Sequence, residues 1–205
     1  LASIFQNGDS ATGKTLSNEC YNAVYSETGF TATFGNCVLN GSDNVNGTLI
    51  VTYGSGSDGA DFTARYEDFF VGTTALNGTR TFSHGAGSDE NTLVLEVTSD
   101  MTVTMEDGRI ISETGTRTLE FQFGENFEEI SYEIGGSWVV NMEDKTYGVR
   151  IESPLRGTFS CTYLVSGLME LRKNGLAVSV DLGDGTCDNR AILTYPNGAQ
   201  EQLEF

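Results

Sequence analysis

The sequence predicts an all-β fold, built as an antiparallel meander that forms either a long twisted β-sandwich or an incomplete β-barrel. The composition, with 25 Gly and only two Pro in 205 residues, favours strands and turns over helices. Apolar and polar residues alternate over long stretches, as in strands with one buried face. Asn-Gly and Asp-Gly dipeptides, which favour the positive φ angles of tight turns, stand between several of these stretches. We therefore expect a single all-β domain over residues 1–205.

The N-terminal part of the chain has the weakest pattern. Residues 1–19 are polar and without a clear period, and we expect residues 1–28 to be loosely ordered, as a linker or a loosely attached first strand. The pattern sharpens from Gly29 onward. Strand-like runs, each bounded by Gly, Asn or Asp, follow at 30–41, 47–53, 61–72 and 78–84.

The longest strands are expected in the middle of the chain. From Leu93 to Met105 the odd positions are mostly apolar and the even positions mostly polar, which predicts a strand with one buried and one wet face. The turn at Asp107-Gly108 leads to a returning strand, Arg109 to Phe123. The alternation resumes from Ile130 to Met142 and from Tyr147 to Ile151. At about 3.3 Å per residue, the longest of these strands exceed about 40 Å, a length typical of twisted sheets and barrels.

The C-terminal part reads as a meander of short strands separated by hairpin dipeptides. The expected strands are Cys161–Arg172, Leu176–Leu182, Asn189–Tyr195 and Ala199–Phe205. The expected turns are Asn174-Gly175, Asp184-Gly185 and Asn197-Gly198. The last strand is predicted to lie at the edge of the sheet. Unpaired edges recruit other strands, so addition of one subunit to another is expected there.

Four cysteines fall into two pairs that are local in sequence, Cys20 with Cys37 and Cys161 with Cys187. Three connectivities are possible in principle, and we favour the local one. Each bridge would then stabilise the fold by about 3 kcal/mol through the loop that it closes. A metal site made by these cysteines is disfavoured, because the chain has no CxxC motif and only one His. The cysteines therefore indicate an oxidising compartment.

The charge of the chain narrows the choice of partners. A formal net charge of −18 disfavours nucleic acid and anionic membrane surfaces, because both are bound through clusters of Lys and Arg. No run of 18 apolar residues occurs, so no transmembrane segment is expected. The acidity mainly predicts solubility, and it could also attract divalent cations.

Several segments together resemble a family of surface lipoproteins common in Bacteroidetes and related Gram-negative bacteria. The segments are NGTRTFS (Asn77 to Ser83), MEDGRIISETGTRTLEF (Met105 to Phe121), YEIGGSWVVNMEDKTYGVRIESPL (Tyr132 to Leu155) and GDGTCDN (Gly183 to Asn189) with the upstream Cys161. The resemblance spans residues 30–205. It implies a β fold and a place on the outer-membrane surface, and no enzymatic activity. The sequence lacks the N-terminal Cys that is lipidated in this family, so a secreted and a lipid-anchored protein both remain open.

One candidate metal site lies within this motif. Carboxylate and amide oxygens are the ligands that calcium prefers, and four such side chains fall within nine residues: Asp181, Asp184, Asp188 and Asn189. Their spacing is not that of an EF-hand. Asp and Asn at tight turns also cap their own backbone, and this is the simpler interpretation. The sequence thus suggests no cofactor other than a possible calcium ion at these residues.

No catalytic constellation is evident. His84 is the only histidine, and no G-x-S-x-G motif accompanies it. Trp138 and Tyr132 could line a sugar-binding surface if they were exposed, but the alternation places them on the apolar face, which favours core packing. The adjacent Phe69 and Phe70 must point to opposite faces of their strand.

The sequence thus favours a non-enzymatic extracellular protein of the cell surface. Its expected role is structural or interactive, with other surface proteins or copies of itself as partners. The alternative is a carbohydrate- or calcium-binding module of a surface nutrient-uptake system, with a polysaccharide as ligand. Exposed aromatic residues in a groove would favour this alternative.

Overall fold

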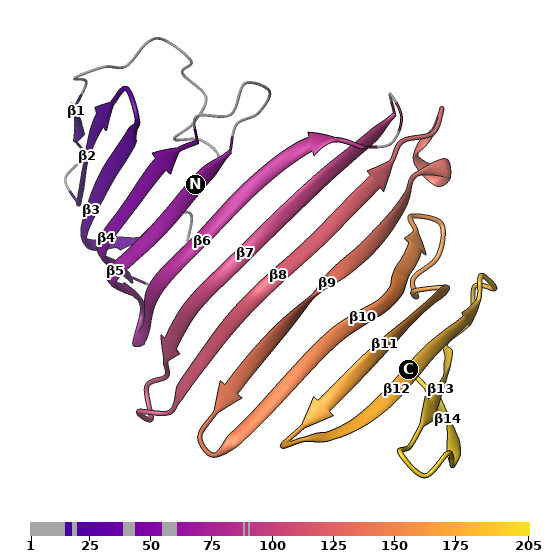
Figure 1. The fold of residues 1–205 in the computed structure, drawn as a ribbon. Coiled ribbons are helices and arrows are strands. Elements are labelled where there is room, and N and C mark those ends of the chain that lie inside the picture. Colours follow the sequence, from indigo (N-terminus) through magenta and orange to yellow (C-terminus); the bar gives the residue numbers. More distant parts are fainter. Residues whose placement is uncertain (1–14, 18–19, 39–43, 55–60, 88, 90) are drawn as a thin grey trace.

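The computed structural model describes residues 15–17, 20–38, 44–54, 61–87, 89 and 91–205. The strands form a single sheet of fourteen, in which each strand pairs with its neighbours in sequence (Figure 1). They are β1 (Thr15–Ser17), β2 (Tyr21–Ser26), β3 (Gly29–Val38), β4 (Asn44–Tyr53), β5 (Phe62–Val71), β6 (Thr74–Ala86), β7 (Thr92–Thr104), β8 (Ile110–Gln122), β9 (Ser131–Met142), β10 (Lys145–Thr158), β11 (Ser166–Lys173), β12 (Leu176–Asp184), β13 (Arg190–Thr194) and β14 (Gln200–Glu204). A short 3-10 helix, η2 (Phe127–Glu129), lies between β8 and β9.

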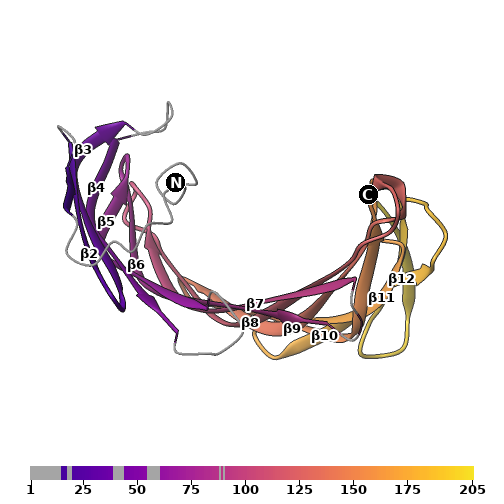
Figure 2. The same cartoon turned by 90° about the horizontal axis from the view of Figure 1, so that it is seen from above.

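The predicted all-β antiparallel meander is confirmed. All strands belong to one sheet rather than to two facing sheets, and β1 and β14 are its edges. The sheet is strongly curved and its two ends stay apart (Figure 2), so of the two predicted architectures the incomplete barrel is the one observed. In the part of the chain that the structure describes, no helix has the length and apolar character needed to cross a membrane.

The N-terminal segment is part of this sheet wherever it is described. β1 pairs with β2, and β2 pairs with β3 along its whole length. Of the residues that we expected to be loosely ordered, 1–14 and 18–19 lie outside the described residues.

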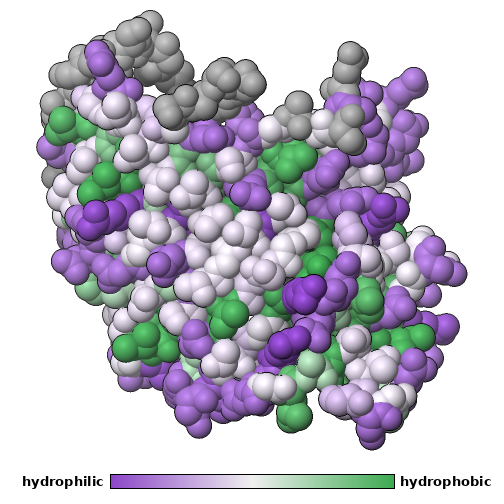
Figure 3. All heavy atoms as spheres, viewed as in Figure 1, coloured by the Kyte–Doolittle hydropathy of each residue, from purple (hydrophilic) through white to green (hydrophobic). Residues whose placement is uncertain are grey.

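Strict alternation gives the two faces of the sheet opposite characters. The odd residues of β7 are apolar apart from Ser99, and they lie in register with the odd residues of β8. This apolar face lies on the concave side of the sheet. The outer, convex face is seen in Figure 3, where hydrophobic residues are scattered among polar ones.

A ladder of threonines crosses the convex face. The residues are neighbours in register on five consecutive strands, β4 to β8: Thr52, Thr63, Thr81, Thr98 and Thr116. The hydroxyls of Thr63 and Thr81 are 3.0 Å apart, and those of Thr98 and Thr116 are 2.9 Å apart. Such cross-strand pairs fit the pleat well, because β-branched side chains pack on it and their hydroxyls bond across it.

The two clusters of buried hydrophobic residues on the concave face lie toward its ends. An N-terminal cluster is centred on Phe30, Phe34 and Leu49 of β3 and β4. A C-terminal cluster is centred on Leu155 and Val180 of β10 and β12. Among the described residues, none from β7 or β8 belongs to either cluster. In the part of the chain that the structure describes, the middle of the sheet joins two packed arms and has only Met101 and Ser99 of β7 buried on this face.

Two expected strand limits in the C-terminal meander were wrong. The strand expected from Cys161 begins only at Ser166, because residues around Cys161 form a turn in which its N–H bonds to the carbonyl of Thr158. Asp184-Gly185 is not a two-residue hairpin turn either. β12 continues to Asp184 and a longer connection leads to β13 at Arg190. The turn at Asn174-Gly175 is confirmed, with φ angles of 48° and 87°.

β4 and β6 begin earlier than expected, because two Asn-Gly dipeptides lie inside strands rather than at their ends. The side-chain oxygen of Asn46 accepts a hydrogen bond of 2.7 Å from the N–H of Asn36, and that of Asn77 accepts one of 2.8 Å from the N–H of Asp68. Asn36 and Asp68 have φ angles of 56° and 45° at irregularities of the strand register. The asparagines therefore satisfy donors that the bulges leave outside the ladder.

Candidate functional site

The open middle of the concave face is the candidate site. We call it the apolar trough and define it as the concave face of β6 to β10. Most of its apolar side chains are half-buried, among them Leu95, Val97, Val103, Leu119, Val140 and Met142, whereas Met101 of β7 and Leu155 of β10 are buried. A sheet face of this composition is normally covered by a second layer. In the trough, no such layer occurs among the described residues.

A cluster of charged residues lies in the centre of the apolar trough. Arg117 donates two hydrogen bonds to Glu113, of 2.7 and 3.0 Å, in the bidentate arrangement that arginine and carboxylate favour. Arg80, on β6, has a guanidinium nitrogen 3.9 Å from the same carboxylate. The Arg117 guanidinium lies over the ring of Trp138, 4.3 Å from its centre, as in a cation–π contact. Two arginines thus share one glutamate.

The charge balance of this cluster is positive. The hydrogen bonds from Arg117 lower the pKa of Glu113 from its ordinary value of 4.5, so Glu113 is ionised at neutral pH. One of the two arginine charges is then left over. The Nε of Arg80 is buried and has no hydrogen-bond partner among the described residues. The Arg80 side chain as a whole is 41 % exposed and lies 3.9 Å from Glu113 without a hydrogen bond to it, so Arg80 is the arginine with capacity left to bind an anion.

Gly115 provides the space for this arrangement. It lies between Glu113 and Arg117 on the same face of β8, in register with Trp138 of β9. Its φ angle is 142°, and a Cβ there would overlap the backbone of Ser137 and Trp138. The missing side chain allows the two charged residues to meet across it.

Trp138 and Tyr132 lie on the concave face as predicted, but neither is in a closed core. Both are half-buried. Tyr132 makes an edge contact with Phe159, 6.0 Å between ring centres. Trp138 has Arg117 on its ring and is half-buried on the concave face. A partly exposed aromatic ring is the feature that the carbohydrate-binding alternative requires.

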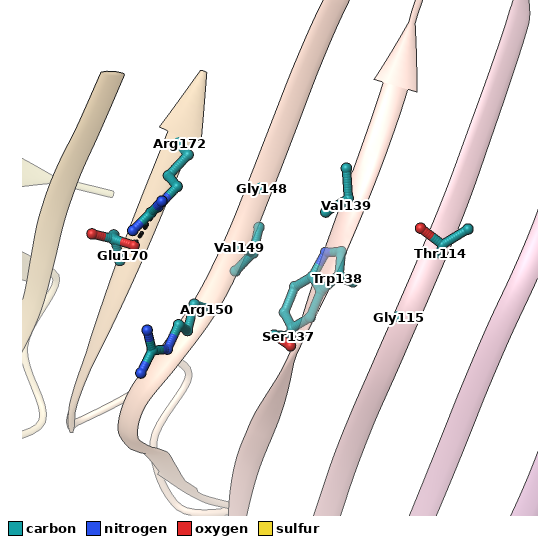
Figure 4. A pocket seen from close by; sticks show the side chains of 10 residues that line it. All are labelled: Thr114, Gly115, Ser137, Trp138, Val139, Gly148, Val149, Arg150, Glu170 and Arg172. Carbon is teal, nitrogen blue, oxygen red and sulfur yellow. Dashed lines mark hydrogen bonds and ion pairs between the residues drawn. The ribbon is translucent and has the colours of Figure 1, made fainter. Parts of the chain in front are cut away.

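A shallow depression of about 550 Å³ lies on the opposite side of the same strands (Figure 4). It forms over Gly148, whose missing side chain leaves a gap between its register partners Val139 and Arg172. Arg172 is bound to Glu170 at 2.6 Å. Because Trp138 alternates with Ser137, its ring belongs to the concave face, so this depression lacks an aromatic platform.

Three of the four residues of the predicted calcium site, the aspartates, cap their own turns, and Asn189 bonds to the last residue of the chain. Asp181 accepts from the N–H of Gly183 at 2.9 Å. Asp184 accepts from the hydroxyl and the N–H of Thr186, which lowers the pKa of its carboxyl. Asp188 accepts from the N–H of Arg190 at 3.0 Å, and Asn189 donates to the carbonyl of Phe205 at 3.4 Å. No group of three potential metal ligands occurs within the described ranges. A calcium site here stays a prediction.

The predicted cysteine pairs are joined. Cys20 is bonded to Cys37 and Cys161 to Cys187, with Cα atoms 5.1 and 5.9 Å apart. The first bridge ties the start of β2 to the end of β3, and the second ties the turn after β10 to the connection between β12 and β13. Both are compatible with an oxidising, extracellular environment.

His84 lies on the concave side of β6, where its Nδ1 is 3.8 Å from a carboxylate oxygen of Asp61. Both side chains are exposed, so this is a surface contact of small energetic value.

Sequence reasoning missed Arg80, Glu113 and Arg117. Their signal was present, because Glu113 and Arg117 stand at positions of β8 that share a face with Leu119 and Phe121. Charged residues in phase with an apolar alternation indicate a polar group that the fold places on its apolar face.

The fold and the site define a class of protein: an open, disulfide-linked antiparallel sheet whose concave face carries a cationic centre. Comparison with protein-family models, curated proteins and solved structures finds no match to this chain.

Proposed function

We propose that the protein is a non-enzymatic extracellular protein of the cell surface, with a structural or interaction role. The observation that carries this proposal is the apolar trough, a concave face of mostly half-buried apolar side chains over which the described residues place no second layer. Large exposed apolar surfaces mark sites of interaction in soluble proteins. The two disulfides are compatible with the location.

Other surface proteins or copies of the same chain are the proposed partners. β14 is an edge strand that consists of exposed polar residues apart from the half-buried Leu203. Its free backbone groups could pair with a strand of another subunit. The glutamates at 201 and 204 oppose non-specific pairing, so a matching basic or neutral edge would be required.

A polysaccharide is the second candidate ligand. The observation that favours it is a pair of aromatic residues on the concave face. Trp138 of β9 is half-buried and pairs with Val149 of β10, and Tyr147 lies two residues from Val149 on the same face. Aromatic faces beside arginine and carboxylate groups suit the apolar and hydroxyl faces of a sugar.

Assembly state is the experiment that tests the proposal. Electron microscopy and light scattering are performed on the same sample of the protein isolated from its native surface. Polymers, rings or a stable complex support the structural role. A strictly monomeric protein without a bound partner contradicts it, and titration with glycans then tests the second candidate.

A further inference from the structure

The charges of the molecule are segregated between its two faces. The chain carries 29 acidic and 11 basic side chains. By strand register, the concave face holds four of the basic side chains and few of the acidic ones. The basic residues of the strands on this face are Arg80, Arg117, Lys145 and Lys173, and the acidic ones are Glu113 and Glu201. The trough is thus a positive surface in a strongly acidic protein.

The cationic centre has apolar surface on both sides along the strands. On β8, Arg117 is followed on the same face by Leu119 and Phe121, and Glu113 is preceded by Ile111. The stretch from Arg117 to Phe121 measures about 13 Å along the strand. This length is comparable to an extended decyl chain.

We propose that the apolar trough binds an anionic amphiphile, with its apolar chain along the trough and its carboxylate or phosphate against Arg80 and Arg117. This inference goes beyond the proposed surface role and does not depend on it. The carboxylate of Glu113 occupies one arginine, and the second guanidinium pairs with the ligand. The acidic convex face repels the same ligand, so binding is confined to the trough.

The geometry favours an extended chain over a peptide. A strand from a partner would find no free backbone edge inside the trough, because every strand from β6 to β10 is paired on both sides. A helix needs about 12–15 residues, roughly 20 Å, to be stable by itself. The apolar stretch between the cationic centre and the end of β8 is shorter than this.

Trp138 reports on binding directly. It is the only Trp in the chain, and it is in contact with Arg117. The full chain is titrated with decanoate and with decyl phosphate below their critical micelle concentrations, and the emission of Trp138 is recorded. Decyltrimethylammonium tests the sign of the charge, and acetate and inorganic phosphate test the head group without the chain. We expect a saturable blue shift with both anionic amphiphiles and binding of the cationic one weaker by about tenfold or more.

Paired variants test the assignment of the head group. Arg80→Met should weaken decanoate binding about tenfold, and Arg80→Lys should retain most of the affinity. Arg65→Met is the matched control, because Arg65 lies on the convex face and pairs with Glu67. It should leave binding unchanged. Independently of any variant, higher salt should weaken the binding of decanoate.

Four results would overturn the proposal. They are equal binding of anionic and cationic amphiphiles, binding of acetate or inorganic phosphate as tight as that of the long chains, undiminished binding by a folded Arg80→Met protein, and absence of any shift in Trp138 emission. If the amphiphiles fail and an acidic amphipathic peptide shifts the emission instead, the trough is a protein-docking groove. The proposed surface role would then stand, because it does not require the amphiphile.

Discussion

The adjacent residues Phe69 and Phe70 on β5 provide a direct test of the two-faced sheet. Phe69 is 9 % exposed and makes edge contacts with Phe34 and Tyr66, with ring centres 5.8 and 5.4 Å apart. Phe70 points to the other face and is 37 % exposed. Truncation of a buried Phe to Ala costs about 3–5 kcal/mol, from lost burial and from the cavity left behind. We therefore expect Phe69→Ala to lower the free energy of unfolding by about 3 kcal/mol and Phe70→Ala by less than about 1 kcal/mol.

The assay is urea denaturation followed by far-UV circular dichroism, with both variants measured beside the wild type. The comparison is sharp because the two substitutions remove the same atoms from neighbouring positions of one strand. Equal losses for the two variants would refute the assignment of faces. A neutral Phe69→Ala would show that the N-terminal arm lacks the tightly packed core described above.

Other predictions concern charge, covalent links and backbone. Hydrogen bonds from an arginine lower the pKa of Glu113 below 4.5, so its contribution to stability is present above that pH and is lost as the pH falls through the lower, folded-state value. Glu113→Gln should flatten the acid limb of a stability–pH curve measured by thermal melting; an unchanged limb would contradict this. Cys161→Ser removes the disulfide to Cys187, which closes a loop of 26 residues. It should lower the free energy of unfolding, measured with denaturant, by about 3 kcal/mol. A loss below about 1 kcal/mol would argue against the bridge. Gly115→Ala should cost more than about 2 kcal/mol, since its φ and its neighbours exclude a Cβ, whereas Gly85→Ala, with open space around it, should be nearly neutral in the same melts.

The sequence was most informative where one residue type decides a local geometry. The alternation predicted a strand from Leu93 to Met105, and β7 spans Thr92–Thr104. The turn at Asn174-Gly175 was predictable because Asn and Gly readily adopt the positive φ angles that the structure shows there. The end of β10 could not be predicted, because the alternation breaks after Ile151 while the strand continues to Thr158. The register shifts between Arg150 and Leu155, and a proline, which cannot donate to the ladder, is accommodated at this irregularity.

The candidate site was less predictable, for a physical reason. Alternation tells which side chains share a face, but it contains no information on what covers that face. Trp138 was assigned correctly to the apolar face and was expected in a core, because most apolar faces are covered. Whether a meander closes or stays open depends on the summed twist and curvature of all strands, to which each bulge contributes. The openness of the trough therefore emerges only in three dimensions.

The order of the strands also determines how the molecule can fold. Every pair of elements with extensive contact is a pair of sequence neighbours, so each strand needs only the preceding one to be in place. The free energy of folding should then resemble that of a repeat protein. It is approximately the sum of a contribution from each strand and a contribution from each pair of neighbouring strands, without contacts between strands that are distant in sequence. Folding can start at any long hairpin, such as β7 with β8, and proceed in both directions with short loops to close. Unfolding should begin at the edge strands β1 and β14. The two disulfides lie inward of these edges, one linking β2 to β3 and the other linking the turn after β10 to the connection between β12 and β13, so each bridge limits how far such an opening can spread.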